Sequence, residues 1–222
     1  MKKLIVFNAE SAYYYFTDAS FRHSVHGAHR LYCDSASLSL VLRLCSVPHA
    51  RLHGPDLMDF YLRDNSAGRV MVIGGSSQAH RRIQEKYNLK QAKYIDRQLS
   101  AKNVEELGLE VIEFDPHVIF VCLGLRKQEA VADLINRNLG EHYTKTKASI
   151  VGVGAAVDFL GETKVRSGPI WQKLGLEWLP RVAREPRMVP RIFRSLIGCF
   201  LTVLWMKSFK DNNLIFAKDF ND

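Results

Sequence analysis

The sequence predicts an α/β fold: a Rossmann-like, mainly parallel sheet with helices on both faces, followed by a basic amphipathic helical C-terminal appendage. Three observations carry this prediction: short apolar runs that end in glycine, helix-like segments between them, and a C-terminal quarter that holds most of the net positive charge. Strands that alternate with helices are typical of parallel sheets. A chain of 222 residues, 47% of them hydrophobic, is long enough to bury such a core.

The first strand is expected in "MKKLIVFNAES", where an apolar run follows two lysines and stops at Asn8. The run is too short for a signal peptide, and no small-residue cleavage site follows it. We therefore expect the protein to stay in the cytosol.

Three further segments combine an apolar run with a glycine turn. The run over 69–73 leads through Gly74 and Gly75 into a helix that Ser76 or Ser77 would cap. The run over 118–123 leads through a turn at Gly124 into a helix over 127–139, and "ASIVGVGAAVDFLG" supplies a third strand. A ligand is expected beyond the C-terminal strand ends, where these turns gather.

The glycine turns allow two interpretations. Glycine lets backbone N–H groups approach a phosphate at a helix N-terminus, but a glycine after a parallel strand more often only makes a tight turn. The chain has no GxGxxG after its first strand and no GxxxxGK[ST], so neither the dinucleotide nor the P-loop fingerprint is present.

Polar residues near the strand ends are candidates for chemistry, each with a simpler alternative. Asp34 ends a short apolar stretch and could either act on a substrate or cap the next helix. Arg51 precedes a Gly-Pro turn, and Asp56 follows it, where capping is the more ordinary role. The turn over 126–129 could contact a ligand or form a solvated first helical turn.

The four cysteines, Cys33, Cys45, Cys122 and Cys199, form no CxxC pair and have no Cys/His ligand spacing. This pattern favours a reducing compartment and no zinc or other metal site.

The C-terminal quarter is strongly basic. Residues 166–210 contain nine Lys/Arg against two Glu, a net charge of +7 of the chain's +8. Five arginines recur every three or four residues, at Arg181, Arg184, Arg187, Arg191 and Arg194, with apolar side chains between them. This pattern indicates a docking surface for a nucleic acid or an anionic membrane; an ordinary amphipathic helix packed on the sheet is the alternative.

The uncharged run over 195–206 is shorter than the roughly 20 residues of a membrane-spanning helix, so we expect it to lie in a membrane interface.

Over nearly its whole length, the chain resembles the WecG/TagA/CpsF family of bacterial glycosyltransferases. The resemblance rests on "VFNAES", the acid at Asp34, "RLHGPDL", "VIGGS", "CLGLRKQE", "VGVGAAVDFLGE", "RSGPIW" and "GLEWLPRVAREPR". It implies transfer of a hexose or N-acetylhexosamine, of the N-acetylmannosamine (ManNAc) type, from a UDP-sugar to a polyprenyl-diphosphate-linked saccharide. Such an enzyme works peripherally, at the cytoplasmic face of the bacterial inner membrane.

The resemblance also assigns roles to single residues. Asp34 matches the base and Arg51 an arginine that meets the donor diphosphate. The donor pocket is matched by Gln128, Asp158, Gly74 and Gly75. Arg181 and Arg191, with Arg187 beside them, match basic residues that contact the acceptor diphosphate and the membrane. No DxD motif occurs, so inverting transfer without a metal or other cofactor is expected. The chain departs from the family pattern at Val6, Ser35, Arg126 and Met188.

We expect a glycosyltransferase body over 1–174 and a membrane-docking appendage over 175–222. The alternatives are a non-enzymatic nucleotide- or nucleic-acid-binding module with a basic tail, and a nucleotide-dependent oxidoreductase. The first lacks an RNP, KH or zinc signature, and the second lacks a dinucleotide fingerprint.

Overall fold

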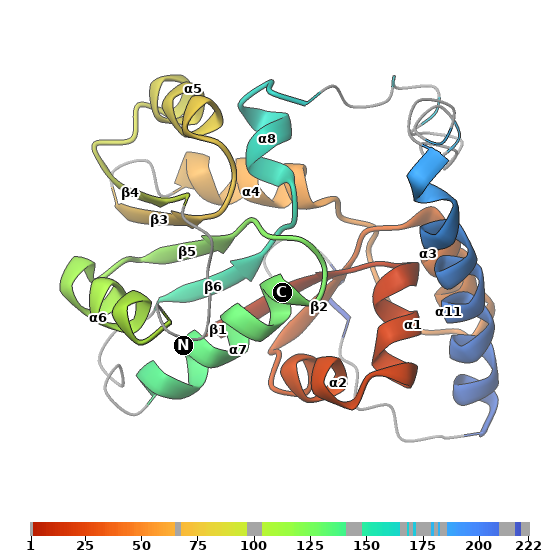
Figure 1. The fold of residues 1–222 in the computed structure, drawn as a ribbon. Helices are drawn as coiled ribbons and strands as arrows, with labels where there is room; N and C mark the ends of the chain where they lie inside the picture. The colour runs from red at the N-terminus through yellow and green to blue at the C-terminus, as the bar shows by residue number, and fades with distance from the viewer. Residues whose placement is uncertain are drawn as a thin grey trace.

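A six-stranded sheet forms the centre of the molecule (Figure 1). The computed structural model describes residues 2–64, 68–96, 104–140, 148–164, 168, 171, 179, 182, 186–208 and 216–218. The strand order is β2-β1-β6-β5-β3-β4, and every pair is parallel. The strands are β1 (Lys2–Phe7), β2 (Arg30–Cys33), β3 (Arg69–Ile73), β4 (Gln91–Ile95), β5 (Val118–Val121) and β6 (Ser149–Gly152). The predicted fold class is confirmed.

Helices cover both faces of this sheet (Figure 1). Those of the body are α1 (Ala9–Thr17), α2 (Ala19–His26), α3 (Ala36–Leu44), α4 (Gly54–Asp64), α5 (Ser77–Tyr87), α6 (Val104–Phe114), α7 (Lys127–Gly140) and α8 (Ala156–Leu160). Helices α4, α5 and α8 pack on the face that carries Val70 and Val72, and α6 and α7 pack on the face that carries Met71 and Ile73. Both faces of the central strands are buried, so β5 and most of β3 are unbroken apolar runs.

The predicted elements lie close to where the sequence placed them. The strand over 69–73 is confirmed, and Ser76 caps the following helix by accepting a hydrogen bond from the backbone N–H of Ala79. The strand predicted over 118–123 ends two residues earlier, at Val121. The helix predicted over 127–139 extends to Gly140.

Helix α11 (Val189–Ser208) follows a short 3-10 turn, η2 (Pro186–Met188), and lies beside α1 and α3 (Figure 1). It comes very close to α1 at Gly198, where an added Cβ would lie 2.1 Å from the carbonyl oxygen of Ala9 and 2.6 Å from the backbone nitrogen of Tyr13. Only a residue without a side chain allows the two helices to come this close.

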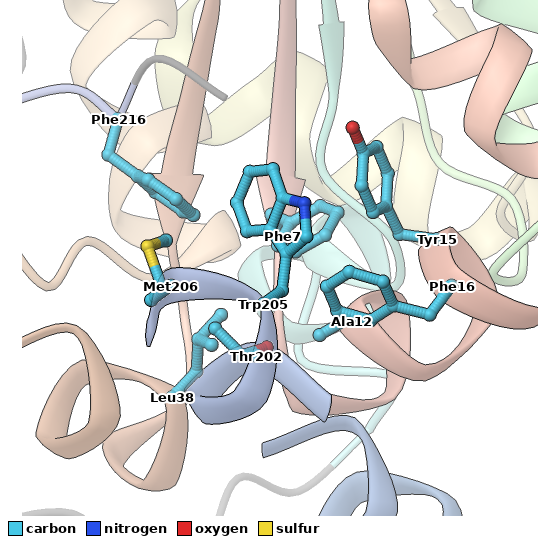
Figure 2. A pocket seen from close by; sticks show the side chains of 9 residues that line it. All are labelled: Phe7, Ala12, Tyr15, Phe16, Leu38, Thr202, Trp205, Met206 and Phe216. Atoms are coloured by element: carbon cyan, nitrogen blue, oxygen red, sulfur yellow. The ribbon is translucent and has the colours of Figure 1, made fainter. Parts of the chain in front are cut away.

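Aromatic side chains complete the contact between α11 and α1. The ring of Trp205 lies 6.3 Å from that of Tyr15 and 5.9 Å from that of Phe16, both edge-on (Figure 2). The cavity left among these rings has a volume of about 10 Å³, room for about one water molecule. It is a packing gap, not a ligand site.

The segment around Phe216 returns to the sheet. Phe216 forms a parallel bridge with Leu31 of β2, and the carbonyl of Ala217 accepts a hydrogen bond from the backbone N–H of Ala50 at 2.9 Å. Helix α11 and residues 216–217 of the expected appendage thus pack on the body, while the expected boundary between residues 174 and 175 lies outside the described residues.

One helix in the described part of the chain, Pro186–Met206, is long and apolar enough to cross a membrane by length and composition alone, with a mean hydropathy of 1.4. The uncharged run over 195–206, from which an interfacial location was expected, is only the C-terminal part of this helix. Arg191 and Arg194 interrupt the apolar run in the sequence, and the structure pairs both with a carboxylate of the body.

Candidate active site

The turns that follow β1, β2, β3, β5 and β6 meet at one edge of the sheet, because the carboxyl ends of parallel strands all lie there. Contacts link these turns side by side. An added Cβ at Gly54 would lie 2.6 Å from the carbonyl oxygen of Val153, and one at Gly75 would lie 2.4 Å from the side chain of Val157. The body residues predicted from sequence therefore lie along one row of neighbouring turns.

Asp34 lies directly after β2, and its backbone N–H donates to the carbonyl of Phe7 at 3.0 Å. The capping alternative for this residue is wrong, because Ser35 is the N-cap of α3. The hydroxyl of Ser35 accepts hydrogen bonds from the backbone N–H groups of Leu38 and Ala9. The Asp34 carboxylate is left for another role, and its side chain is 33% exposed.

The partner of Asp34 is His53, whose Nδ1 donates a hydrogen bond to Asp34 Oδ1 at 2.8 Å. His53 belongs to the extended segment that runs beside the end of β2, where Leu52 donates its backbone N–H to the carbonyl of Cys33 at 2.9 Å. The sequence analysis did not select His53. Its position two residues after Arg51 is the available signal, because alternate residues of an extended segment point the same way.

Arg51 lies in the same segment, bridged in parallel to Cys33. Its Nε is buried, and within the described part of the chain it has no hydrogen-bond partner. A buried N–H group without a partner costs about 1–3 kcal/mol, and more when it is charged. A bound anion at this position would remove that cost, so the observation fits the predicted contact with a diphosphate.

Cys33 and Cys122 also lie near this edge. Burial raises the pKa of the Cys33 thiol to about 12, and the neighbouring Asp34 carboxylate acts in the same direction. Burial raises the pKa of the Cys122 thiol to about 12 as well. Neither thiol is a nucleophile at neutral pH.

Gly74 and Gly75 form the turn after β3 with φ values of +93° and +89°. A side chain at Gly74 would collide with the carbonyl oxygen of Cys122, 2.5 Å away. The turn is also held by His80, whose Nε2 donates to the carbonyl of Gly74 at 2.8 Å. Both glycines are therefore required by the fold, which supports the tight-turn interpretation. Contact of this turn with a UDP-sugar stays a prediction.

Beside this turn, an open groove of about 310 Å³ runs along α5 and the end of β4. Its lining side chains are Ser77, His80, Arg81, Gln84, Tyr94 and Asp96.

Gln128 and Glu129 are buried at the start of α7, so the solvated-turn alternative is wrong for both. Gln128 accepts a hydrogen bond from the backbone N–H of Gly154 at 2.6 Å and donates one to Glu129 Oε1 at 2.8 Å. The other oxygen of Glu129 accepts the backbone N–H of Arg126 at 2.7 Å. Burial raises the pKa of Glu129, and these hydrogen bonds partly oppose the rise. Gln128 thus joins the turns after β5 and β6.

Asp158 lies in α8 and is largely buried. Its Oδ2 forms an ion pair with Lys164 Nζ at 2.5 Å, and its backbone carbonyl accepts hydrogen bonds from the backbone of Thr163 and Lys164. The predicted donor residue is therefore tied to the turn that ends α8.

The three predicted arginines of the tail differ in their surroundings. Arg181 lies outside the described residues, and Arg187 is exposed in η2. Arg191 Nε is 2.6 Å from Glu10 Oε2, and Arg194 Nη2 is 2.8 Å from Glu10 Oε1. Glu10 is 5% exposed, so this carboxylate of α1 holds α11 by two ion pairs. The sequence analysis did not assign this role to Glu10.

The apolar side of α11 faces away from the body. Its large exposed side chains are Val189, Phe193, Leu196, Ile197, Phe200 and Leu204. This arrangement contradicts the alternative of an ordinary amphipathic helix that buries its apolar face on the sheet. Helix α11 packs on α1 through another side, which carries Gly198, Thr202 and Trp205.

Among the residues that the structure describes, no three His, Cys, Asp or Glu side chains converge on a point where they could hold a metal ion. The imidazole of His53 is hydrogen bonded to Asp34, and the Arg51 guanidinium and the Asp34 carboxylate both act on the thiol of Cys33.

Comparison with known protein families gives one match of nearly full length. Residues 2–213 match the family model described as "Glycosyl transferase WecG/TagA/CpsF family". The matched range contains every turn of the C-terminal sheet edge and the whole of α11.

Proposed function

The chain belongs to the WecG/TagA/CpsF family of glycosyltransferases, and on that premise we propose that it moves a hexose or N-acetylhexosamine of the ManNAc type from a UDP-sugar to a polyprenyl-diphosphate-linked saccharide. Membership of a transferase family favours this activity over the nucleic-acid-binding module and the oxidoreductase. The observation that carries the proposal is a carboxylate, Asp34, open to solvent beside Arg51, whose buried Nε has no partner in the described chain.

The reaction we propose is a single inverting displacement. The acceptor hydroxyl oxygen forms a bond to the anomeric carbon, and the bond from that carbon to the diphosphate oxygen breaks. The hydroxyl proton passes to Asp34, and UDP leaves with the electron pair of the broken bond. Asp34 is suited to this role because its side chain is partly exposed and is not used as a helix cap.

Arg51 would stabilise the departing diphosphate. A guanidinium is permanently charged, and its planar fork matches phosphate oxygens. The backbone of Arg51 is bridged to that of Cys33 at the end of β2, one residue before Asp34 in the chain. The charge that develops on UDP would therefore meet a positive group already in place, which is the arrangement that lowers a barrier most.

The donor would extend from Arg51 along the row of turns, past Gly154 and the turn of Gly74 and Gly75. Gln128 supports this row of turns because its side-chain oxygen accepts a hydrogen bond from the backbone N–H of Gly154. We assign it and Asp158 to the donor side of the site, where they shape the turns that the nucleotide would contact.

A UDP-release assay tests the proposal, with UDP-ManNAc and a lipid-diphosphate-linked sugar acceptor, with and without EDTA. We expect turnover that is insensitive to EDTA. Asp34→Asn should lower turnover by roughly 10² to 10⁴ while UDP affinity holds. Asp64→Asn is the matched control, since Asp64 is exposed at the end of α4. Equal turnover in Asp34→Asn and the control would refute the assignment of Asp34.

The acceptor is a lipid, and we propose that the protein docks peripherally on the cytoplasmic face of the inner membrane through α11 and α3. The outward side chains of α11 form a stripe that includes Phe193, Phe200 and Leu204, and α3 adds Leu40, 59% exposed, and Leu44, 75% exposed. The two helices pack against each other, and we propose that these side chains form one apolar surface.

Basic residues border that surface. Arg187 is exposed in η2, just before α11, and Arg43 is exposed on α3 between the two leucines. Each basic residue near an anionic bilayer contributes about 1 kcal/mol of attraction, which salt screens. Arg191 lies in the first turn of α11, beside the start of α1 and hence at the edge of the sheet where the strands end, and Arg187 lies in η2 just before it. This placement suits contact with an acceptor diphosphate.

Sedimentation with phosphatidylglycerol-containing vesicles tests the surface. Serine at Phe200 or Leu44 should weaken binding at any salt concentration, and Arg187→Glu should weaken it mainly at low salt. Leu109→Ser on α6 is the control, because Leu109 is 68% exposed and lies away from α11 and α3. An equal effect of all three apolar substitutions would refute docking through this face.

A further inference from the structure

We propose that His53 is the positioning residue of the candidate base: it fixes one oxygen of Asp34 so that the other is directed at the acceptor hydroxyl. This inference rests on the proposed function for its chemistry. It rests on the structure for its geometry, which is the 2.8 Å hydrogen bond between His53 Nδ1 and Asp34 Oδ1.

The direction of this hydrogen bond follows from the chemistry of the two groups. An ionised carboxylate can only accept, so the proton of the bond belongs to Nδ1 of the imidazole. A neutral His53 is then the Nδ1–H tautomer, with Nε2 free of a proton. Within the described part of the chain, Asp34 Oδ2 makes no hydrogen bond, so one oxygen of the carboxylate is fixed and one is open.

The backbone around His53 is held on both sides. The preceding residue, Leu52, is hydrogen bonded to the carbonyl of Cys33 at 2.9 Å, and the carbonyl of His53 accepts the first helical hydrogen bond of α4, from Leu57, at 2.9 Å. The next residue, Gly54, packs against the carbonyl of Val153 so closely that no side chain fits. The imidazole therefore projects from a fixed point, as a group that orients a catalytic side chain must.

The exposures of the two side chains agree with this division of roles. Asp34 is 33% exposed and His53 is 20% exposed, so the carboxylate is the more accessible of the pair. Without this hydrogen bond, the Asp34 side chain would be free to rotate, and its carboxylate would often point away from the acceptor hydroxyl. The bond from His53 removes that freedom before binding, and misplacement of a reacting group by about 1 Å can cost a hundredfold in rate.

Three substitutions separate positioning from other roles. His53→Ala removes the N–H group that donates a hydrogen bond to Asp34. We expect kcat to fall about 10- to 100-fold with the KM for the UDP-sugar nearly unchanged. His53→Asn places an amide N–H where Nδ1–H was and should restore most of the turnover. His53→Gln places its amide near Nε2 instead and should not. His49→Ala is the control, since His49 lies in the same connection but bonds Ser39 and Val47.

A second measurement does not depend on turnover. Long-range ¹H–¹⁵N NMR of the imidazole should show His53 as the Nδ1–H tautomer in the wild type. In Asp34→Ala it should show the Nε2–H tautomer, which free histidine favours. If the wild-type protein transfers no sugar, the proposed function fails, while the tautomer result still reports on the pair.

Two outcomes would overturn the inference. Full activity in His53→Ala would mean that Asp34 needs no orientation. Loss of activity in His53→Ala without recovery in His53→Asn would assign the essential group to Nε2, and His53 would then be the base in place of Asp34.

Discussion

Replacing Gly198 by alanine tests how α11 is attached to the body. Glycine in a helix interior is less favourable than alanine by about 1 kcal/mol, so propensity alone would make this substitution stabilising. At Gly198, however, the new Cβ would lie 2.1 Å from the carbonyl oxygen of Ala9. Real Cβ atoms essentially never approach other atoms within 3.0 Å, so the two helices must separate by about 1 Å.

The matched substitution is Gly108→Ala in α6, where an added Cβ meets no atom within 4 Å. Both changes have the same effect on helix propensity, so their difference isolates the steric term. Overpacking costs about 1–3 kcal/mol, more where backbone atoms are the obstacle. We therefore expect Gly198→Ala to unfold at least 1–3 kcal/mol more easily than Gly108→Ala. In a protein of this size, that is about 2–12 °C in Tm.

Amide hydrogen exchange locates the effect. Separation of the helices would move Trp205 away from Tyr15 and Phe16 and stretch the ion pairs of Glu10. We expect faster exchange in α11 and α1, with exchange in β3 and β5 unchanged. Equal stability of the two alanine variants, with unaltered exchange in α11, would refute the reasoning that Gly198 sets the helix distance.

Three further predictions concern buried polar groups. Lys3 is fully buried and paired with Asp133 at 2.7 Å, so Lys3→Ala should cost about 3–5 kcal/mol in denaturant unfolding. The raised pKa of Glu129 means that the folded state holds its proton more tightly than the unfolded state, so stability falls as pH rises from about 4.5 through the folded pKa. Glu129→Gln should remove that part of the pH dependence. The thiols of Cys33 and Cys122 should react with iodoacetamide only after unfolding, because burial raises the pKa of each to about 12.

The central strand β3 was predictable from the sequence, and the outermost strand β4 was not. Strand β3 was placed to the residue because a parallel strand buried on both faces is an unbroken apolar run. Strand β4 was not identified in the sequence. It lies at the end of the sheet, and its sequence, QAKYI, is polar at Gln91 and Lys93, since only the last residue, Ile95, is fully buried.

The candidate site was predictable only where chemistry is local. Asp34 was selected for its place at a strand end, but neighbouring residues compete for the cap of α3, and the sequence could not assign it to Ser35. The pairing of Asp34 with His53 spans 19 residues and depends on the path of α3 and the segment after it. Glu10 meets Arg194 across 184 residues of sequence, a contact that periodicity cannot show.

The same limit applies to α11. The sequence shows both arginines and apolar residues along this helix, but a helix that carries both can dock on the body through either kind of side chain. Gly198 decides the outcome, because it permits contact with α1 on the side that also carries Arg191 and Arg194.

The return of Phe216 and Ala217 to β2 has a consequence for synthesis on the ribosome. These residues and α11 emerge after every strand of the sheet, so β2 and α1 form before their final cover exists. Until then, Glu10 is hydrated and the outer edge of β2 offers unpaired backbone groups, which is where chains aggregate. The contacts that close this edge join residues more than 180 positions apart, and contacts of such long range form slowly. A nascent chain therefore passes through a stage in which its apolar C-terminal helix and the surface that receives it are both uncovered, and a bilayer close to the ribosome would compete for that helix.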